Sequence, residues 1–212
     1  FNDVDKATLT TQSFYGVKDR TLAAGGSAEG KTPAGLMDVT NVEVTYGEPS
    51  TVTGSTVIGA DSAWDQMLAA MRGDEVTPTY GWVLDLVDIA GAGSGERVLE
   101  KPSVLGGLVM FSTFKPNIDI CQYGGDGRIY GLYYETGTAY KQDVFNLHDP
   151  GIGTKLARSL DLGQGRPSGL AIHLGQQKGG KLYIQQSTGT IEELVMKAPF
   201  RAKSGNVIWY ED

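Results

Sequence analysis

Three side chains near the start of the chain have the chemistry of a calcium site. Asn2, Asp3 and Asp5 could supply three oxygen ligands, fewer than the roughly six to eight that Ca²⁺ takes in proteins. The shorter run Asn117-Ile118-Asp119 is a second candidate. Asn and Asp also hydrogen-bond to nearby backbone in turns, so a capped turn is the default interpretation at both places.

The other residues that could carry catalysis do not form a recognisable set. His148 and His173 have no Cys or Glu partner at ligand spacing, so no zinc site is predicted. Glu192 and Glu193 are neighbours on a predicted strand and point to opposite faces, so they cannot flank one glycosidic bond. The sequence contains no nucleophile elbow, no HExxH and no phosphate-binding loop. We therefore predict a protein that binds and is not an enzyme.

A group of aromatic side chains is the candidate binding site. Tyr130, Tyr133 and Tyr134 crowd one predicted strand, and Trp82 lies near the end of another. The two-residue period of a strand places Tyr130 and Tyr134 on one face and Tyr133 on the other. Such residues most often fill the packing between sheets. The functional alternative is a stacking surface for a glycan or a partner protein.

Composition narrows the class of protein. The chain has 212 residues, 18 basic and 25 acidic side chains and a net charge of −7, which disfavours nucleic acid and anionic membranes as partners. No run approaches the ~20 apolar residues of a membrane span, and the first residues do not form a signal peptide. Thirty glycines are about twice the average share and suit many short strands joined by tight turns. The single cysteine, Cys121, cannot form an internal disulfide.

The segment from Val98 to Gly137 is predicted to organise the fold. Its apolar run ends at Phe114, and Gly124–Gly127 is predicted to be a tight turn. An alternating strand, Arg128–Tyr134, follows and is closed by a turn at Glu135–Gly137. Further predicted strands are Ser13–Val17, Asp38–Tyr46, Thr51–Ile58, Gly81–Leu86, Thr154–Leu162, Leu170–Leu174, Lys181–Gln186, Ile191–Val195 and Asn206–Tyr210.

One helix is predicted, from Ser62 to Arg72. Ser62 has the side chain of an N-cap and Gly73 ends the helix. The apolar residues Trp64, Met67, Leu68 and Met71 share one face, which we expect to pack on a sheet edge.

The number of strands predicts part of a larger all-β fold. Roughly ten to twelve short strands would make two to three four-stranded blades, whereas a β-propeller has about four to eight. We expect residues 1–212 to form the final blades of a quinoprotein-like β-propeller, with one short inserted helix. Residues 21–80 are expected to be an inserted loop and helix region.

Five segments resemble one protein family. They are "TQSFYGVKD" (Thr11–Asp19), "GWVLDL" (Gly81–Leu86), "GERVLEKPSVLGGLVMFSTF" (Gly95–Phe114), the stretch Cys121–Gly137 and the terminal "SGNVIWYED". Together they resemble the C-terminal part of the PilC/PilY proteins, which are adhesins and biogenesis factors associated with the tip of the type IV pilus.

The resemblance implies a function, a location and partners. It implies a protein that supports pilus assembly and surface adhesion at an extracytoplasmic site, on the cell surface or at the pilus tip. Implied partners are the remainder of the propeller or a separate N-terminal chain, pilin or minor pilins, and a host or abiotic surface. Calcium is possible by resemblance, although the family's loop of alternating Asp and Asn is not found here and no other cofactor is evident. Cys121 would either pair outside this chain or remain a free thiol. The alternative function is a structural subunit of an extracellular filament or envelope complex, completed by another chain.

Overall fold

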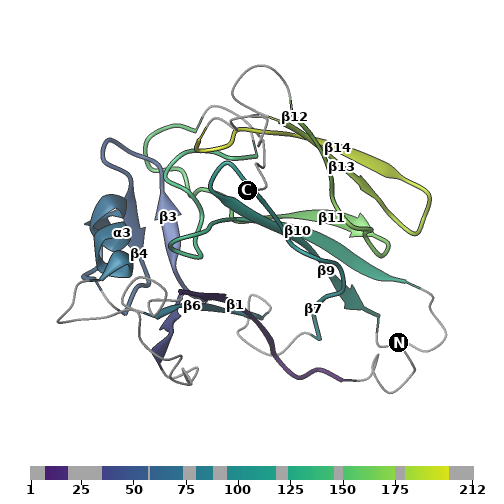
Figure 1. The fold of residues 1–212 in the computed structure, drawn as a ribbon, viewed down its shortest axis with the longest axis horizontal. Coiled ribbons are helices and arrows are strands. Elements are labelled where there is room, and N and C mark those ends of the chain that lie inside the picture. Colours follow the sequence, from purple (N-terminus) through teal and green to yellow (C-terminus); the bar gives the residue numbers. More distant parts are fainter. Residues whose placement is uncertain are drawn as a thin grey trace, which may run out of the picture.

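The computed structural model describes residues 8–18, 35–56, 58–73, 80–87, 95–117, 124–145, 150–174 and 180–200. Four sheets and one helix make up this part of the chain (Figure 1). The N-terminal sheet has the order β1 (Gln12–Val17), β6 (Gly81–Leu86), β2 (Met37–Asp38), and the helix-side sheet has the order β3 (Glu43–Thr45), β4 (Thr51–Thr53), β5 (Ser62–Ala63). The central sheet has the order β11 (Ser159–Gln164), β10 (Gly125–Tyr133), β9 (Leu108–Pro116), β7 (Arg97–Val98), with β8 (Ser103–Leu105) also paired to β9. The C-terminal sheet has the order β12 (Ala171–Leu174), β13 (Gly180–Gln185), β14 (Ile191–Met196).

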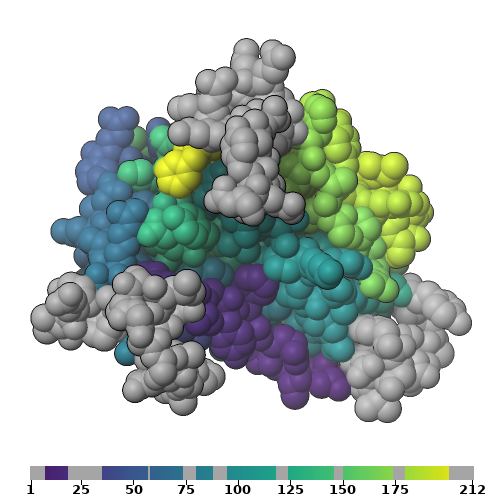
Figure 2. All heavy atoms as spheres, in the orientation of Figure 1, coloured from purple at the N-terminus to yellow at the C-terminus, as the bar shows by residue number. Residues whose placement is uncertain are grey.

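The central sheet separates two hydrophobic cores. Its longest ladder is antiparallel and runs from Gly125 opposite Pro116 to Tyr133 opposite Leu108. The first core joins this sheet to the N-terminal and helix-side sheets, and the second core joins it to the C-terminal sheet. Both faces of β9 and β10 are therefore covered, and most residues of the two strands are buried. Figures 1 and 2 show the helix side (blue) and the C-terminal sheet (yellow-green) on opposite flanks of the central strands.

Helix α3 (Trp64–Arg72) is anchored in the first core by its apolar face. Trp64, Met67 and Met71 are buried. The indole Nε1–H of Trp64 donates to the carbonyl of Ala139 at 3.2 Å. The predicted end at Gly73 is confirmed, since this residue has a φ of 64° and its N–H donates to the last turn.

The predicted N-cap was wrong. Ser62 is paired with Val52 in the ladder between β4 and β5, so its backbone is extended and the helix begins one residue later than predicted. Ala63 is the N-cap, and its N–H donates to Oε1 of Gln66 at 3.1 Å.

The predicted tight turn at Gly124–Gly127 was also wrong. Gly125 and Gly127 lie within β10, opposite Pro116 and Phe114. A Cβ on Gly125 would lie 2.4 Å from the carbonyl oxygen of Lys115 and 2.6 Å from the Phe114 ring. Glycine is needed here because two strands approach closely, not because the chain reverses. The turn predicted at Glu135–Gly137 is present, with Gly137 at a φ of 68°.

Two long predicted strands are shorter than expected. The run Asp38–Tyr46 is divided between β2, which pairs with β6, and β3, which pairs with β4. The run Thr51–Ile58 contributes only the three residues of β4, after which Gly54 adopts a φ of 75°. In both cases the chain leaves one sheet for another, which a local pattern of side chains does not reveal.

The all-β class with one short helix is confirmed. Within the described ranges no sheet closes on itself, and the sheets have three or five strands instead of the four predicted per blade. The predicted insertion supplies β2 to β5 and α3, which pack into the first core. Asn2, Asp3, Asp5, Cys121, His148 and the predicted strand Asn206–Tyr210 lie outside the described residues. No helix in the described part of the chain is long and apolar enough to cross a membrane.

Candidate functional site: a charged cleft

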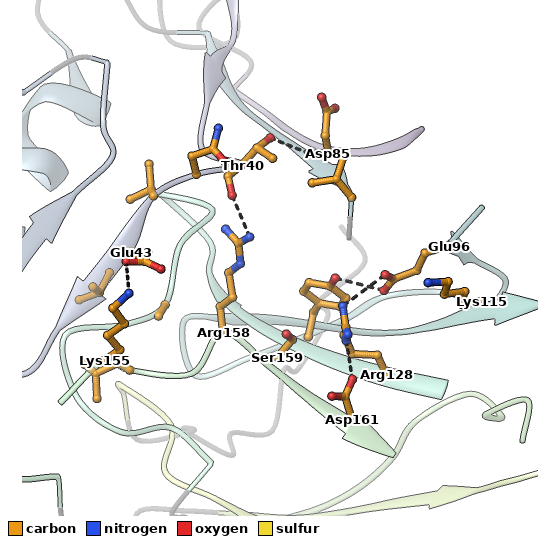
Figure 3. A pocket seen from close by; sticks show the side chains of 17 residues that line it. Thr40, Glu43, Asp85, Glu96, Lys115, Arg128, Lys155, Arg158, Ser159 and Asp161 are labelled. Atoms are coloured by element: carbon orange, nitrogen blue, oxygen red, sulfur yellow. Dashed lines mark hydrogen bonds and ion pairs between the residues drawn. The ribbon is translucent and has the colours of Figure 1, made fainter. Parts of the chain in front are cut away.

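A cleft of about 770 Å³ opens where the N-terminal, helix-side and central sheets meet (Figure 3). Its charged lining residues come from six separate parts of the sequence. They are Glu43, Asp85, Glu96, Lys115, Arg128, Lys155, Arg158 and Asp161. Four of these side chains are acidic and four are basic, so what the cleft can bind depends on which charges neutralise one another.

Glu96 is the buried centre of one wall. It is 4% exposed. One carboxylate oxygen accepts hydrogen bonds from the hydroxyls of Thr113, at 2.6 Å, and Tyr130, at 3.1 Å. The other accepts from Nη1 of Arg128 at 3.3 Å. A buried carboxylate is tolerated only when partners of this kind bind to it. These bonds join Glu96, which precedes β7, to Thr113 of β9 and to Arg128 and Tyr130 of β10.

Arg128 links this buried group to the surface. Its Nε–H donates to Asp161 at 2.8 Å, across the β10–β11 ladder in which the two residues are opposite each other. Burial alone would lower the pKa of Arg128, but the neighbouring Tyr130, Asp161 and Glu96 raise the pKa overall. Burial, with a contribution from the charge of Glu96, raises the pKa of Tyr130 to about 12. Tyr130 is therefore neutral and Arg128 charged at any physiological pH.

Arg158 lies on another wall and is held by main-chain atoms. Its Nη1 donates to the carbonyl of Val39 at 3.2 Å and its Nη2 to the carbonyl of Thr40 at 2.8 Å. These bonds fasten the chain between β2 and β3 to the residue that precedes β11. Burial lowers the pKa of Arg158 from its ordinary value.

The rim of the cleft carries the remaining charges. Lys155 pairs with Glu43 at 2.6 Å, and both side chains are largely exposed. Asp85 accepts a hydrogen bond from the hydroxyl of Ser13 at 2.5 Å. Lys115 is exposed and forms no ion pair with any residue that the structure describes.

The cleft has the chemistry of a binding site. Among the described residues, no three His, Cys, Asp or Glu side chains are placed to hold a metal ion together. The hydroxyl of Ser168, a residue that does not line the cleft, donates to the carbonyl of Gly169. His173 is exposed on β12, and Glu193 is exposed and pairs with Lys181 at 2.5 Å.

The predicted aromatic site is divided between the core and the surface. Trp82, Tyr130 and Tyr133 are only 2%, 4% and 2% exposed, whereas Tyr134 is 47% exposed. The Trp82 indole donates to the carbonyl of Tyr134 at 2.9 Å, and the Tyr130 ring stacks on Phe111 with 4.9 Å between centroids. Of the four, Tyr130 alone lines the cleft, and it does so through its hydroxyl. The calcium candidates Asn2, Asp3 and Asp5 are not among the residues that the structure describes.

Sequence reasoning missed the residues that make the cleft. Arg158 and Lys115 have no motif around them, and Glu96 lies within the family-like segment Gly95–Phe114 but nothing in its local sequence indicates a site. The one local indication is Arg128, a charged residue at the start of a run that is otherwise apolar and aromatic.

Comparisons with known proteins agree with the motifs. The chain is 24% identical, over 222 residues, to the type IV pilus biogenesis factor PilY1 of Pseudomonas aeruginosa (strain UCBPP-PA14), and the match covers 98% of this chain. Its fold is similar to the crystal structure of the Pseudomonas aeruginosa PilY1 C-terminal domain, with a TM-score of 0.58, 19% identity and 93% of this chain covered. No protein-family model matches the chain. The chain spans 18% of the length of the curated relative and 39% of the solved domain. The predicted resemblance is confirmed by both comparisons.

Proposed function

We propose that this chain, which corresponds to the C-terminal part of a PilC/PilY-family protein, supports type IV pilus assembly and surface adhesion. The observation that carries the proposal is the match to PilY1 over nearly the whole chain, in sequence and in fold. That relative is named a type IV pilus biogenesis factor. The proposed place of action is accordingly the cell surface or the pilus tip, with pilin or minor pilins as partners. The proposed activity is binding.

We also propose that the sheets are the final blades of a β-propeller. The central and C-terminal sheets support this, since each contains an antiparallel meander and they pack face to face through the second core. The edge strand β14 exposes Ile191 and Val195, which are 66% and 46% accessible. Exposed apolar edges favour pairing with further chain. The chain covers 39% of the solved domain, so the remaining blades would come from the rest of a longer protein.

Deletion of the gene in the source organism tests the pilus role. Surface pili are counted after shearing, and attachment to an abiotic surface is measured in the same cultures. We expect fewer pili and weaker attachment, with both restored by the intact gene. Pilus number and attachment equal to those of the parent strain would contradict the proposal.

The second candidate is a structural subunit of an extracellular filament or envelope complex that another chain completes. The observation that favours it is that β14 pairs with no strand other than β13 within the described residues. The two candidates differ in whether this chain attaches to surfaces itself. Deletion that removes pili, combined with no attachment of the purified chain to glass or host cells, would favour the structural subunit.

A further inference from the structure

The charged cleft contains a half-buried cation, Arg158, that forms no ion pair with any carboxylate in the described part of the chain. Within the described residues, the guanidinium of Arg158 is bonded only to the carbonyls of Val39 and Thr40, and its Nε–H has no acceptor there. A carbonyl dipole stabilises a guanidinium less than a carboxylate does. Burial is the main cause of the lowered pKa of Arg158, the charge of Arg128 adds to it, and together they outweigh the opposing effects of Tyr130, Glu43 and Glu96.

The other charges in the cleft are already paired or lie at its rim. Arg128 is bonded to Glu96 and Asp161. Lys155 is bonded to Glu43. Arg128 offsets only one of its two carboxylates. After these contacts are set aside, the cations Arg158 and Lys115 remain among the described lining residues, together with two negative charges, one on the Glu96–Asp161 group and one on Asp85, which accepts from Ser13. Figure 3 shows Arg158 rising toward Thr40 and Lys115 on the wall beyond Glu96, so the two cations approach the cleft from different sides.

Arg158 is also fixed in orientation. Two hydrogen bonds to consecutive carbonyls hold its guanidinium plane, so little side-chain entropy is lost when a ligand binds to its free N–H groups. A planar guanidinium presents donors in the geometry that a carboxylate accepts.

We propose that the charged cleft binds an acidic peptide segment, with an Asp or Glu carboxylate of the partner bonded to Arg158 and attracted by Lys115. A phosphate could accept from the same guanidinium donors, so inorganic phosphate is included as a competing ligand in the experiment. A protein segment is favoured over an acidic glycan. Sugars stack on exposed aromatic faces, and the one aromatic residue of the lining, Tyr130, is 4% exposed and stacked on Phe111.

The experiment is a titration of the purified 212-residue chain with tetraglutamate, followed by NMR of backbone amides and arginine Nε–H groups. Tetraglutamine is the uncharged control peptide. We expect tetraglutamate to shift the Arg158 Nε–H resonance and the amides of residues 39–41, and tetraglutamine to shift neither. The Lys115→Gln variant should weaken binding about three- to fivefold, as expected for one lost contact with an exposed charge. Lys181→Gln is the matched control, since Lys181 is an exposed lysine outside the cleft, and it should change the affinity less than about twofold.

Several results would overturn the inference. They are no tetraglutamate-dependent shift at Arg158, an equal loss of affinity in the two lysine variants, and tighter binding of trigalacturonate or inorganic phosphate than of tetraglutamate. The last result would assign the cleft to an acidic glycan or to anions in general. The Arg158→Gln variant should abolish the binding of tetraglutamate. If that variant does not fold, the Nε–H shift of Arg158 in the unchanged chain and the affinity of the Lys115→Gln variant still test the proposal. The inference does not rest on the pilus role, because only the purified chain and defined probes are used.

Discussion

Replacing Glu96 tests whether the buried wall of the cleft holds the sheets together. Glu96→Ala removes the acceptor for the hydroxyls of Thr113 and Tyr130 and the buried partner of Arg128. A buried donor left without an acceptor costs about 1–3 kcal/mol. Thr113 keeps a weak alternative, the carbonyl of Arg128 at 3.4 Å, and Arg128 keeps Asp161. We therefore expect a loss of about 3 kcal/mol, mostly from the unsatisfied Tyr130 hydroxyl and from the lost bond between Arg128 and Glu96.

Two further variants show whether the loss of stability in Glu96→Ala comes from its hydrogen bonds. Glu96→Gln keeps an oxygen acceptor for both hydroxyls, but its amide NH2 replaces the oxygen that accepts from Arg128, so its cost should be about 1–2 kcal/mol and smaller than that of Glu96→Ala. Glu43→Ala removes an exposed carboxylate from the same cleft, which should change stability by less than about 0.5 kcal/mol.

The assay is urea unfolding of the purified chain, supported by thermal melting. For a chain of this size, a loss of about 3 kcal/mol lowers Tm by roughly 6–12 °C. If Glu96→Ala were as stable as Glu43→Ala, or if Glu96→Gln were as damaging as Glu96→Ala, the hydrogen bonds described for Glu96 would not be what stabilises this wall.

The elements that the sequence predicts well are those with a local cause. The bounds of β6 match the predicted strand from Gly81 to Leu86, and the apolar face of α3 is visible from the spacing of Trp64, Met67 and Met71. Both patterns depend on residues close together in the chain, where periodicity is informative. The PilC/PilY motifs were also recognisable because their letters are contiguous.

The elements that it does not predict depend on partners distant in sequence. Gly125 has the composition of a turn, and only the approach of Phe114 and Lys115 shows why a side chain is excluded. The cleft is a stronger case, since Glu96 reaches Arg128, and Arg158 reaches Thr40, only after three sheets have assembled. None of these contacts leaves a local pattern. In the sequence these charged residues look like those of an ordinary solvated surface. They form a site only because the arrangement of the sheets brings them together.

The remaining predictions concern one glycine and the response to alkaline pH. Gly137→Ala should destabilise the chain by about 2 kcal/mol or more, because φ is 68° and the new Cβ would lie 2.3 Å from the Trp82 ring. Gly163→Ala, at a φ of 75° with no atom within 4 Å, should cost only the backbone strain of about 1 kcal/mol. Urea unfolding compares the two, and equal costs would refute the clash. Tyr130 has a pKa of about 12 in the folded chain and about 10 unfolded. Between these values the unfolded state releases a proton that the folded state keeps, so the contribution of Tyr130 to stability should be constant below pH 10 and fall as pH rises toward 12. Tyr130→Phe should reduce the slope of unfolding free energy against pH in that window, and an unchanged slope would show that the buried hydroxyl is not what resists ionisation.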